Sequence, residues 1–182
     1  MTQNSQTKTH RRVVTGHAGA KSTIKSDEQL SAYGFNAVPG YEHTLIWASN
    51  GIPDLSQEPK QEGYPSSVVP GPGGTTLHIV TFPPDSVFQD PSFDQEAAGR
   101  EYAKRLPGLA EAFEHENPGM HKTPTVDYAV VLEGEVWLEV DDGQAVHLKR
   151  GDVVVQNGTR HAWRNKGADR VTMLFVLHGA KS

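Results

Sequence analysis

Short segments in which apolar and polar residues alternate make up much of this chain, and turn residues separate them. The pattern is clearest in the C-terminal third, where six such segments follow one another: 125–132, 134–140, 145–148, 151–156, 160–164 and 170–178. Alternation with a period of two is typical of strands that bury one face. The last segment is apolar on both faces, as in a strand buried between two layers. This succession of short strands predicts an all-β protein, a jelly-roll β-barrel.

The N-terminal half shows the same alternation in fewer places. Residues 43–48 and 75–82 are rich in β-branched and aromatic residues and are expected to form strands. Residues 12–15 and 22–25 suggest a hairpin. Residues 50–74 contain five prolines and are expected to form an irregular loop at the rim of the barrel, since strands of the same barrel lie on both sides of it.

A helical insertion is predicted at residues 92–116, immediately before the first strand of the C-terminal series. Ser92 and Gln95 fit a capping box, residues 95–105 are dense in helix formers, and residues 109–116 suggest a second short helix. Two placements are open. The insertion could cover the mouth of the barrel, or it could pack Tyr102 and Phe113 against the outside.

Composition indicates one globular domain over residues 11–182, preceded by a disordered tail at residues 1–10. Charged residues make up 21% and hydrophobic residues 36%, so neither disorder nor a membrane protein is indicated. A net charge of -5 without a basic stripe argues against a nucleic-acid partner. The chain has no cysteine, which excludes thiolate chemistry and fits a cytoplasmic location.

Candidate chemistry lies on two of the predicted strands. If residues 121–129 are extended, His121 and Asp127 lie on the same face. Near the end of the chain, His161 shares a face with Trp163. Imidazole nitrogens and carboxylate oxygens are suitable ligands for Zn, Fe, Mn or Ni. The spacing therefore predicts that His121, Asp127 and His161 converge on one point in the interior.

Two stretches of this region resemble the motifs of the cupin superfamily. The first superfamily motif contains His-x-His, then Glu, then Gly; the corresponding residues here are His121, Thr123, Asp127 and Gly134. The second contains Gly and, further on, His-x3-Asn; the corresponding residues here are Gly151, His161 and Asn165. Thr123 replaces the second histidine and Asp127 replaces the glutamate. The resemblance implies a cupin-like double-stranded jelly-roll β-barrel with a short helical insertion before the site strand.

The resemblance also implies a function. The chain is expected to be a metal-dependent enzyme of the decarboxylase, isomerase or oxygenase type that acts on a small organic molecule, with His121, Asp127 and His161 as metal ligands and catalytic residues. No nucleotide cofactor is expected. His78, or alternatively His43, could complete the ligand set. The residues expected to line the pocket are Thr123, Thr125, Trp163 and His78.

Three alternatives remain open. His121 and Asp127 could form a metal-free acid–base pair, an arrangement that resembles the metal-free sugar epimerases of the superfamily. The domain could bind a small ligand without catalysis. The polar groups could also satisfy one another in an inactive barrel.

A homodimer is expected as well. Small barrels of this type resemble homodimers in which N-terminal strands pair across the interface, and residues 12–25 could serve that purpose. Such pairing would cover an exposed sheet edge. The other expected partner is the small-molecule ligand.

Overall fold

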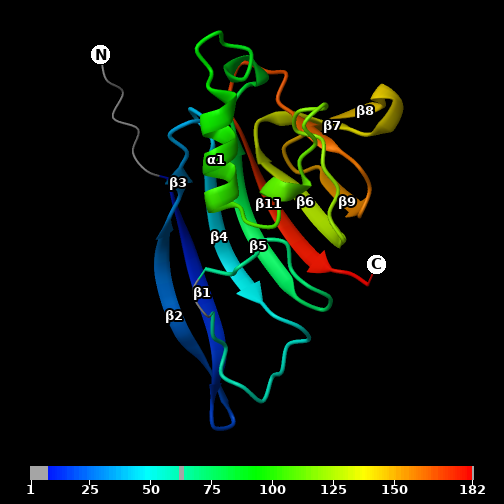
Figure 1. The fold of residues 1–182 in the computed structure, drawn as a ribbon. Coiled ribbons are helices and arrows are strands. Elements are labelled where there is room, and N and C mark those ends of the chain that lie inside the picture. Colours follow the sequence, from blue (N-terminus) through cyan, green and yellow to red (C-terminus); the bar gives the residue numbers. More distant parts are fainter. Residues whose placement is uncertain (1–7, 62–63, 182) are drawn as a thin grey trace, which may run out of the picture.

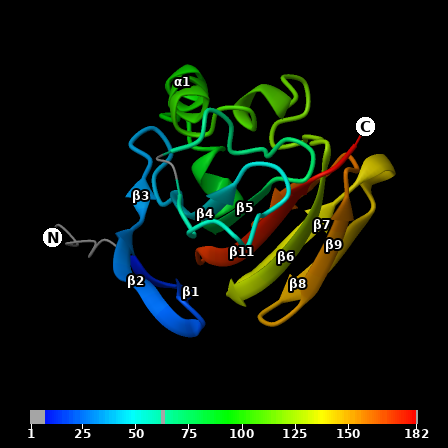
Figure 2. The same cartoon turned by 90° about the horizontal axis from the view of Figure 1, so that it is seen from below.

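Three antiparallel sheets form the framework of the protein in the computed structural model, which describes residues 8–61 and 64–181. The largest sheet has the strand order β3-β4-β5-β11-β6-β9, and a second sheet has the order β10-β7-β8. Strands β1 and β2 pair only with each other and extend beyond the two larger sheets (Figure 1). The two larger sheets face each other as the walls of a barrel, which confirms the predicted all-β jelly-roll class (Figure 2).

The strands lie close to the predicted segments. The strand bounds are β1 Thr9–Ala18, β2 Lys21–Ser31, β3 Tyr33–Gly34, β4 Glu42–Ser49, β5 Thr75–Phe82, β6 Thr125–Glu133, β7 Glu135–Glu139, β8 Ala145–Lys149, β9 Val153–Asn157, β10 Ala162–Arg164 and β11 Val171–Gly179. The short strand β3 has no counterpart in the sequence-based prediction. Gly134, the motif glycine, has a φ of +81° in the turn between β6 and β7, and a Cβ there would lie 3.1 Å from the carbonyl oxygen of Arg170. Glycine is therefore required at this turn.

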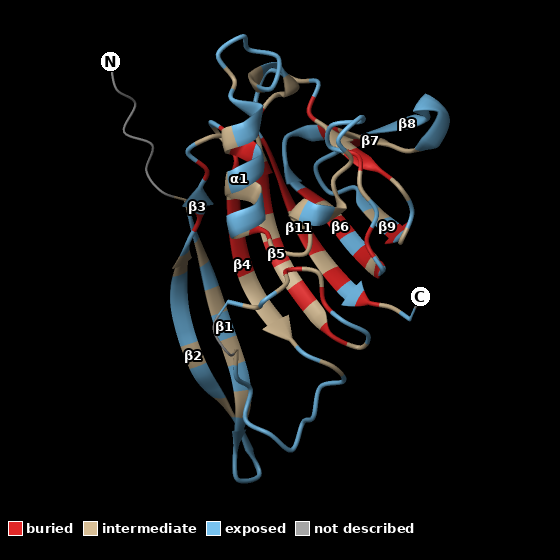
Figure 3. Cartoon of the chain, in the orientation of Figure 1, coloured by how far each residue is buried: buried red, intermediate tan, exposed pale blue. Residues whose placement is uncertain are grey.

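Alternation along the central strands separates an inner from an outer face (Figure 3). On β11, Met173, Phe175 and Leu177 are buried, whereas Leu174 and Val176 on the other face are only half-buried. Within the described residues, β11 is therefore covered by a second layer on one face, not on both as the sequence suggested. The sequence had suggested two covered faces because both faces of β11 carry apolar residues, a composition suited to a strand buried on both sides.

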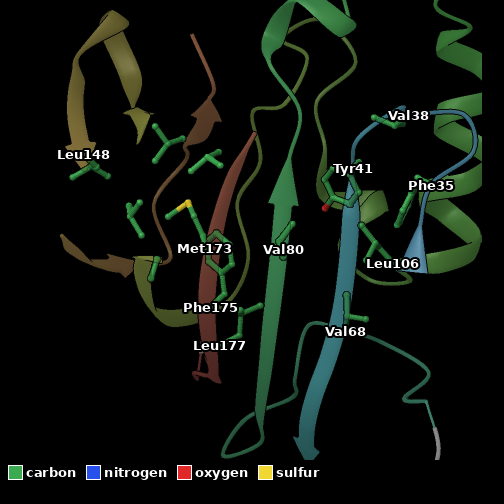
Figure 4. Packing of buried hydrophobic residues seen from close by; sticks show 14 of the residues in the cluster. Phe35, Val38, Tyr41, Val68, Val80, Leu106, Leu148, Met173, Phe175 and Leu177 are labelled. Atoms are coloured by element: carbon green, nitrogen blue, oxygen red, sulfur yellow. The ribbon is translucent and has the colours of Figure 1, made fainter. Parts of the chain in front are cut away.

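The core fills the space between the two larger sheets. Val131, Met173 and Val171 of the six-stranded sheet are at most 1% exposed, as is Val136 of the three-stranded sheet, and Leu148 on β8 is 7% exposed. A second part of the same cluster lies beside β4 and includes Phe35, Tyr41 and Leu106 (Figure 4). The barrel is thus held by inward-facing side chains from both walls.

The predicted insertion forms one α-helix, α1 (Gln95–Arg105), followed by a single 3-10 turn, η2 (Ala110–Ala112). The expected cap at Ser92 is wrong: the carboxylate of Asp94 accepts a hydrogen bond from the amide of Ala97, and Ser92 bonds to Asp90 instead. The expected second helix over 109–116 is also wrong, because the backbone at Phe113 is extended, with φ -70° and ψ 135°. No helix in the described part of the chain is long and apolar enough to cross a membrane.

Two further 3-10 turns are η1 (Asp85–Val87), between β5 and α1, and η3 (Asp141–Gly143), between β7 and β8.

Helix α1 packs beside the barrel through Ala98 and Leu106, which belong to the core. The ring of Tyr102 lies 5.4 Å from the ring of Tyr41 and 5.9 Å from the ring of Phe113. The ring of Phe113 in turn lies 5.0 Å from the imidazole of His121. The insertion therefore contacts the predicted site residue His121 through Phe113.

The N-terminal hairpin is longer than predicted. Strand β1 begins at Thr9, within the segment expected to be a tail, and the rest of that tail, residues 1–7, lies outside the described residues. Arg12 fastens the hairpin to the body by donating a hydrogen bond of 3.0 Å to the carbonyl of Ile46 and by lying over the ring of Trp47. The opposite face of the hairpin is solvent-exposed and carries Val13 and Ile24.

Candidate active site

His121 and His161 are cross-strand neighbours at the centre of the candidate site. Their backbones exchange two hydrogen bonds, of 2.9 Å from the amide of His121 and 3.0 Å from the amide of His161. Their imidazole rings lie 4.3 Å apart between centroids. A second isolated bridge joins His121 to Phe113. Residues from three separate parts of the chain, 113, 121 and 161, thus meet here as a small antiparallel ladder.

Hydrogen bonds orient both imidazoles in the same way. Nδ1 of His121 lies 3.1 Å from the carbonyl oxygen of Gly119, and Nδ1 of His161 lies 3.0 Å from the carbonyl oxygen of Thr159. A carbonyl oxygen only accepts, so each neutral ring donates Nδ1–H to it and keeps the lone pair on Nε2. The same arrangement orients histidines that bind metal ions.

Burial keeps both rings neutral. Burial and, to a smaller extent, the neighbouring His161 together lower the pKa of His121 to about 4, against the effect of its hydrogen bond to Gly119. Burial also lowers the pKa of His161, against the effect of its hydrogen bond to Thr159. Removal from water disfavours the charged imidazolium. At neutral pH the pair therefore offers two unprotonated nitrogens.

Asp127 lies on the inner face of β6, paired with Gln156 of β9 and Leu177 of β11. It is 7% exposed, and its Oδ1 is buried without a hydrogen-bond partner. Burial raises the pKa of Asp127 to about 6, although the hydroxyl of Thr125 acts in the opposite direction. A buried carboxyl with an unsatisfied oxygen is costly in a purely structural role, so it is a candidate for contact with a ligand.

The loop after β9 links Asp127 to the histidine pair. Gln156, which pairs with Asp127, donates a hydrogen bond of 3.1 Å from Nε2 to the carbonyl of Thr159, the same carbonyl that orients His161. Gly158 in this loop lies against the carbonyl oxygens of Thr123 and Thr125. Asp127 and His161 are thus held by one shared loop.

The predicted three-ligand set is not assembled in the structure. Among residues 8–61 and 64–181, no three His, Cys, Asp or Glu side chains stand close enough together to hold a metal ion. His121 lies in the isolated bridge ahead of β6, whereas Asp127 is on the third residue of β6. The chemistry of the donors still fits a divalent ion, since two neutral imidazoles and a carboxyl with an unpartnered oxygen are suitable ligands.

His78 and His43, the candidates for an additional ligand, pair with each other and not with the His121–His161 pair. Nε2 of His43 and Nδ1 of His78 are 2.9 Å apart, and both side chains are buried. They come from β4 and β5, on the opposite side of β11 from Asp127. No ligand set containing them forms among the described residues.

The other predicted lining residues surround the site. The hydroxyls of Thr123 and Thr125 are buried and hydrogen-bonded to each other at 2.8 Å. The ring of Trp163 lies edge-on to His161, with 5.8 Å between centroids, and 5.5 Å from the ring of Phe175. Asn165, the last motif residue, is buried and donates to the carbonyls of Phe82 and Asp169, so it holds a turn.

Sequence reasoning missed that the site belongs to a closed circuit of aromatic contacts. Eight rings follow one another at centroid distances of 4.3–6.1 Å: Tyr102, Phe113, His121, His161, Trp163, Phe175, Phe82 and Tyr41, which returns to Tyr102. These residues are distributed over seven segments of the chain, so no local pattern could reveal the circuit. It gives the histidine pair a mainly apolar and aromatic surrounding.

A pocket of about 410 Å³ lies on the surface next to this strand pair, lined by Met120, Arg160 and Arg164 among others. Its arginines already have partners: Arg160 contacts Glu114 at 2.6 Å and Asp141 at 2.7 Å, and Arg164 contacts Glu139 at 2.6 Å. These cations are therefore neutralised, and the pocket lacks the buried titratable groups that distinguish the interior site.

Comparison with known protein families identifies the region that contains the site. A family model described as a cupin domain matches residues 112–177. Similar proteins include the phomopsin biosynthesis cluster protein C' of Diaporthe leptostromiformis, 51% identical over 63 residues, which are 34% of this chain and 33% of that protein. The oryzines biosynthesis cluster protein J of Aspergillus oryzae is 48% identical over 65 residues, which are 35% of this chain and 36% of that protein.

A third relative is the cupin-domain-containing oxidoreductase virC of Hypocrea virens, 41% identical over 65 residues, 34% of each chain. The matched segments span about a third of the length of these curated relatives. Among solved structures, a putative ethanolamine utilization protein Q from Salmonella typhimurium aligns with a TM-score of 0.44 at 12% identity, over 97% of this chain and 100% of that chain.

Proposed function

Since the chain belongs to the cupin superfamily, we propose that it is an enzyme that transforms a small, partly apolar organic molecule beside His121 and His161. The observation that carries the proposal is the shared orientation of the two rings, which turns two neutral Nε2 lone pairs away from the backbone carbonyls that hold Nδ1. A ring fixed in one tautomer at low pKa is suited to binding an ion or a hydroxyl group.

The names of the relatives support an enzymatic role in small-molecule biosynthesis. Three of them are named for biosynthesis clusters and four as cupin-domain-containing oxidoreductases. The matches cover 36% or less of each relative, so the oxidoreductase class is part of the proposal for this chain. The chain has no cysteine, so the proposed oxidoreductase would draw its redox chemistry from a metal, another cofactor or the substrate itself.

His121 and His161 are the residues that would hold a divalent ion, because their rings lie 4.3 Å apart and Asp127 does not complete a three-residue set among the described residues. When bound, Zn, Fe, Mn or Ni would supply Lewis-acid polarisation of a substrate oxygen, and Fe or Mn would also supply redox chemistry. The chain itself supplies orientation and a dry environment. The carbonyls of Gly119 and Thr159 fix the imidazoles, and the rings of Phe113 and Trp163 limit the access of water to them.

A second candidate is proton transfer without a metal. The observation that favours it is the buried, unpartnered Oδ1 of Asp127, a free position for a substrate proton. A carboxyl with a pKa near 6 can exchange protons at neutral pH, and a neutral imidazole can accept a hydrogen bond from the substrate. In this form Asp127 is the acid–base group, whereas the sequence had suggested a direct His121–Asp127 pair.

Elemental analysis by plasma mass spectrometry, on protein purified without chelator or nickel affinity resin, tests the proposal. Near-stoichiometric Zn, Fe, Mn or Ni in the native protein, lost in both His121→Ala and His161→Ala, supports the metal enzyme. The matched control is His147→Ala, since His147 stacks on Trp137 at 4.1 Å on the three-stranded sheet and should leave the metal content unchanged. If the native protein contains no metal, two alternatives remain: proton transfer by Asp127, or a module that binds a ligand without catalysis. Turnover of a candidate substrate would support proton transfer by Asp127.

We also propose that two copies associate through the N-terminal hairpin. The hairpin forms a separate two-stranded sheet, and its outward face exposes Val13 and Ile24, at 47% and 60%. The outer face of the large sheet is apolar as well, with Tyr128, Val153 and Val155 exposed. Exposed apolar residues on a free sheet edge and face are typical of surfaces that a partner covers.

A further inference from the structure

Gln156 is a buried side-chain amide on β9, beside the candidate active site. It is 4% exposed and pairs across the strands with Asp127, so its side chain lies on the inner face of the large sheet. Its two N–H groups both go to one residue: Nε2 donates to the carbonyl oxygen of Thr159 at 3.1 Å and also to the hydroxyl oxygen of that residue. A buried amide uses its donors in this way because an unpaired N–H is costly away from water. Gln156 is therefore bound to a single position of the loop that follows β9.

The carbonyl of Thr159 is held by side chains. Strand β9 ends at Asn157, and pairing resumes at the isolated bridge of His161, so Thr159 lies between two paired segments. In the described part of the chain, no backbone amide donates to its carbonyl. The donors that this carbonyl does have are Nε2 of Gln156 at 3.1 Å and Nδ1 of His161 at 3.0 Å. Gln156 thus holds the carbonyl oxygen at the place where the imidazole of His161 can donate to it.

The corresponding carbonyl beside His121 is held differently. Gly119, which accepts the hydrogen bond from Nδ1 of His121, lies in a turn that the backbone closes, since the amide of Met120 donates to the carbonyl of Asn117 at 3.0 Å. Within the residues that the structure describes, no hydrogen bond joins Gln156 to this turn. The two imidazoles therefore share one orientation but have separate supports, a backbone turn for His121 and the Gln156 side chain for its neighbour.

This support determines which ring nitrogen of His161 carries the hydrogen. A neutral imidazole has one N–H group, and the hydrogen bonds that the ring can make select the tautomer. With the carbonyl of Thr159 in place, the hydrogen stays on Nδ1 and Nε2 keeps its lone pair. If the carbonyl moves away, the other tautomer becomes available, and its Nε2 is a donor that cannot bind an ion. The amide of Gln156 therefore acts on the site through Thr159, without touching a bound molecule.

We propose that Gln156 is a positioning residue that fixes His161 in the tautomer with its hydrogen on Nδ1. The inference rests on the proposed function in that the lone pair on Nε2 of His161 is the one used there. The alternative is that Gln156 only orders the loop and has no effect on the ring. The two roles differ in what they predict for the tautomer of His161 when the amide is removed.

NMR of chelator-treated protein, labelled with 15N in its nine histidines, measures the tautomers through long-range correlations from the ring protons. At pH 8 an imidazole of ordinary pKa, about 6.5, is neutral, so the nitrogen shifts report the tautomer directly. The signals of His121 and His161 are identified by their loss in His121→Ala and His161→Ala. In the native protein both rings should have their hydrogen on Nδ1. A native His161 with its hydrogen on Nε2 would overturn the proposal.

Gln156→Met removes both donors and keeps the length of the side chain. The ratio of the Nδ1–H to the Nε2–H tautomer of His161 should fall by about five- to tenfold, the equilibrium effect of one hydrogen bond, while His121 should be unchanged. Thr159→Ala is the matched control, because it removes the hydroxyl contact with Gln156 but leaves the carbonyl, so the tautomer of His161 should persist. An unchanged ratio in Gln156→Met, or an equal change at both histidines, would show that Gln156 is a structural residue only.

A second measurement uses the native protein alone and serves if Gln156→Met does not fold. The side-chain amide hydrogens of Gln156 should exchange with deuterium much more slowly than those of Gln144, which is exposed, because both are bonded to Thr159. Equal exchange rates for the two side chains would contradict the hydrogen bonds on which the proposal depends.

The tautomer is measured without metal or substrate, so its outcome is separable from that of the proposed function. A changed tautomer in Gln156→Met, together with loss of metal or turnover in that variant, supports both proposals. A changed tautomer in a protein whose metal content and turnover do not depend on His161 would overturn the proposed function and support the role of Gln156. An unchanged tautomer, in a protein that loses its metal in His161→Ala, would do the reverse.

Discussion

His121 and His161 exchange both backbone hydrogen bonds with each other, at 2.9 and 3.0 Å, and their rings lie 4.3 Å apart. The two residues are separated by 40 positions in sequence, so the contact depends on the meeting of the segment before β6 with the segment before β10. Since the backbone pairing holds both side chains at one place, substitution of either residue should change the chemistry of the site more than the fold.

Divalent metal ions should stabilise the native protein. If His121 and His161 hold the ion, metal at a hundredfold excess over its dissociation constant adds about 2.7 kcal/mol. For a chain of this length, that corresponds to a rise in Tm of about 5–10 °C. Thermal unfolding of chelator-treated protein with added Mn²⁺ or Zn²⁺ measures it. His161→Ala should show no rise, while His147→Ala should behave like the native protein, and an equal rise in all three would contradict the assignment.

Asp127→Asn should stabilise the metal-free protein above pH 6. Burial raises the pKa of Asp127 to about 6 from an ordinary value near 3.8, so the folded state binds the proton more tightly than the unfolded state. The contribution of the Asp127 carboxyl to the stability of the native protein is complete below pH 3.8 and is lost as the pH rises through 6. The free energy of unfolding of Asp127→Asn should exceed that of the native protein by on the order of 2 kcal/mol at pH 7, and this difference should decrease toward pH 4.

Urea unfolding at several pH values, in the presence of a chelator, measures this difference. The buried histidines have lowered pKa values and act in the opposite direction, but they are the same in both proteins, so the comparison isolates Asp127. Asp169→Asn, at an exposed position, is the control. A difference that does not vary with pH would argue against a raised pKa.

Asp94→Ala should destabilise helix α1, whereas Ser92→Ala should not. The carboxylate of Asp94 accepts a hydrogen bond of 2.9 Å from the amide of Ala97, and loss of such a cap costs about 1 kcal/mol. Ser92 makes no contact with the helix amides and bonds to Asp90, so its substitution should stay within about 0.5 kcal/mol. Chemical unfolding of the two variants compares them directly. A larger effect of Ser92→Ala would restore the capping box that the sequence suggested.

Charged substitutions on the hairpin should separate the dimer. The double variant Val13→Glu with Ile24→Glu places two carboxylates on the outward face of β1 and β2, where burial against a partner would be costly. Light scattering on a sizing column should give the mass of two 19.9 kDa chains for the native protein and of one chain for the variant. Val146→Glu, at an exposed position on β8, should leave the mass unchanged. A native monomer would refute the proposed association.

The strands after residue 124 could be located from sequence because each buries one face and ends at a turn residue. Thr125, Asp127, Ala129 and Val131 alternate with more exposed neighbours, as a period of two requires. The helix cap could not be located so well, since Ser92 and Asp94 both suit a cap and only the local turn around Asp90 determines which one serves.

By itself, the sequence determined the class of the fold and the positions of most strands, and it singled out His121, Asp127 and His161, of which Asp127 and His161 are buried and His121 is half-buried. These follow from local alternation and from the scarcity of such side chains in a barrel interior. The tertiary structure alone decided the partners: His121 pairs with His161 and not with Asp127, and His43 pairs with His78. The physical reason is that strand order and register, which are set by packing between segments far apart in the chain, determine which inward-facing side chains become neighbours.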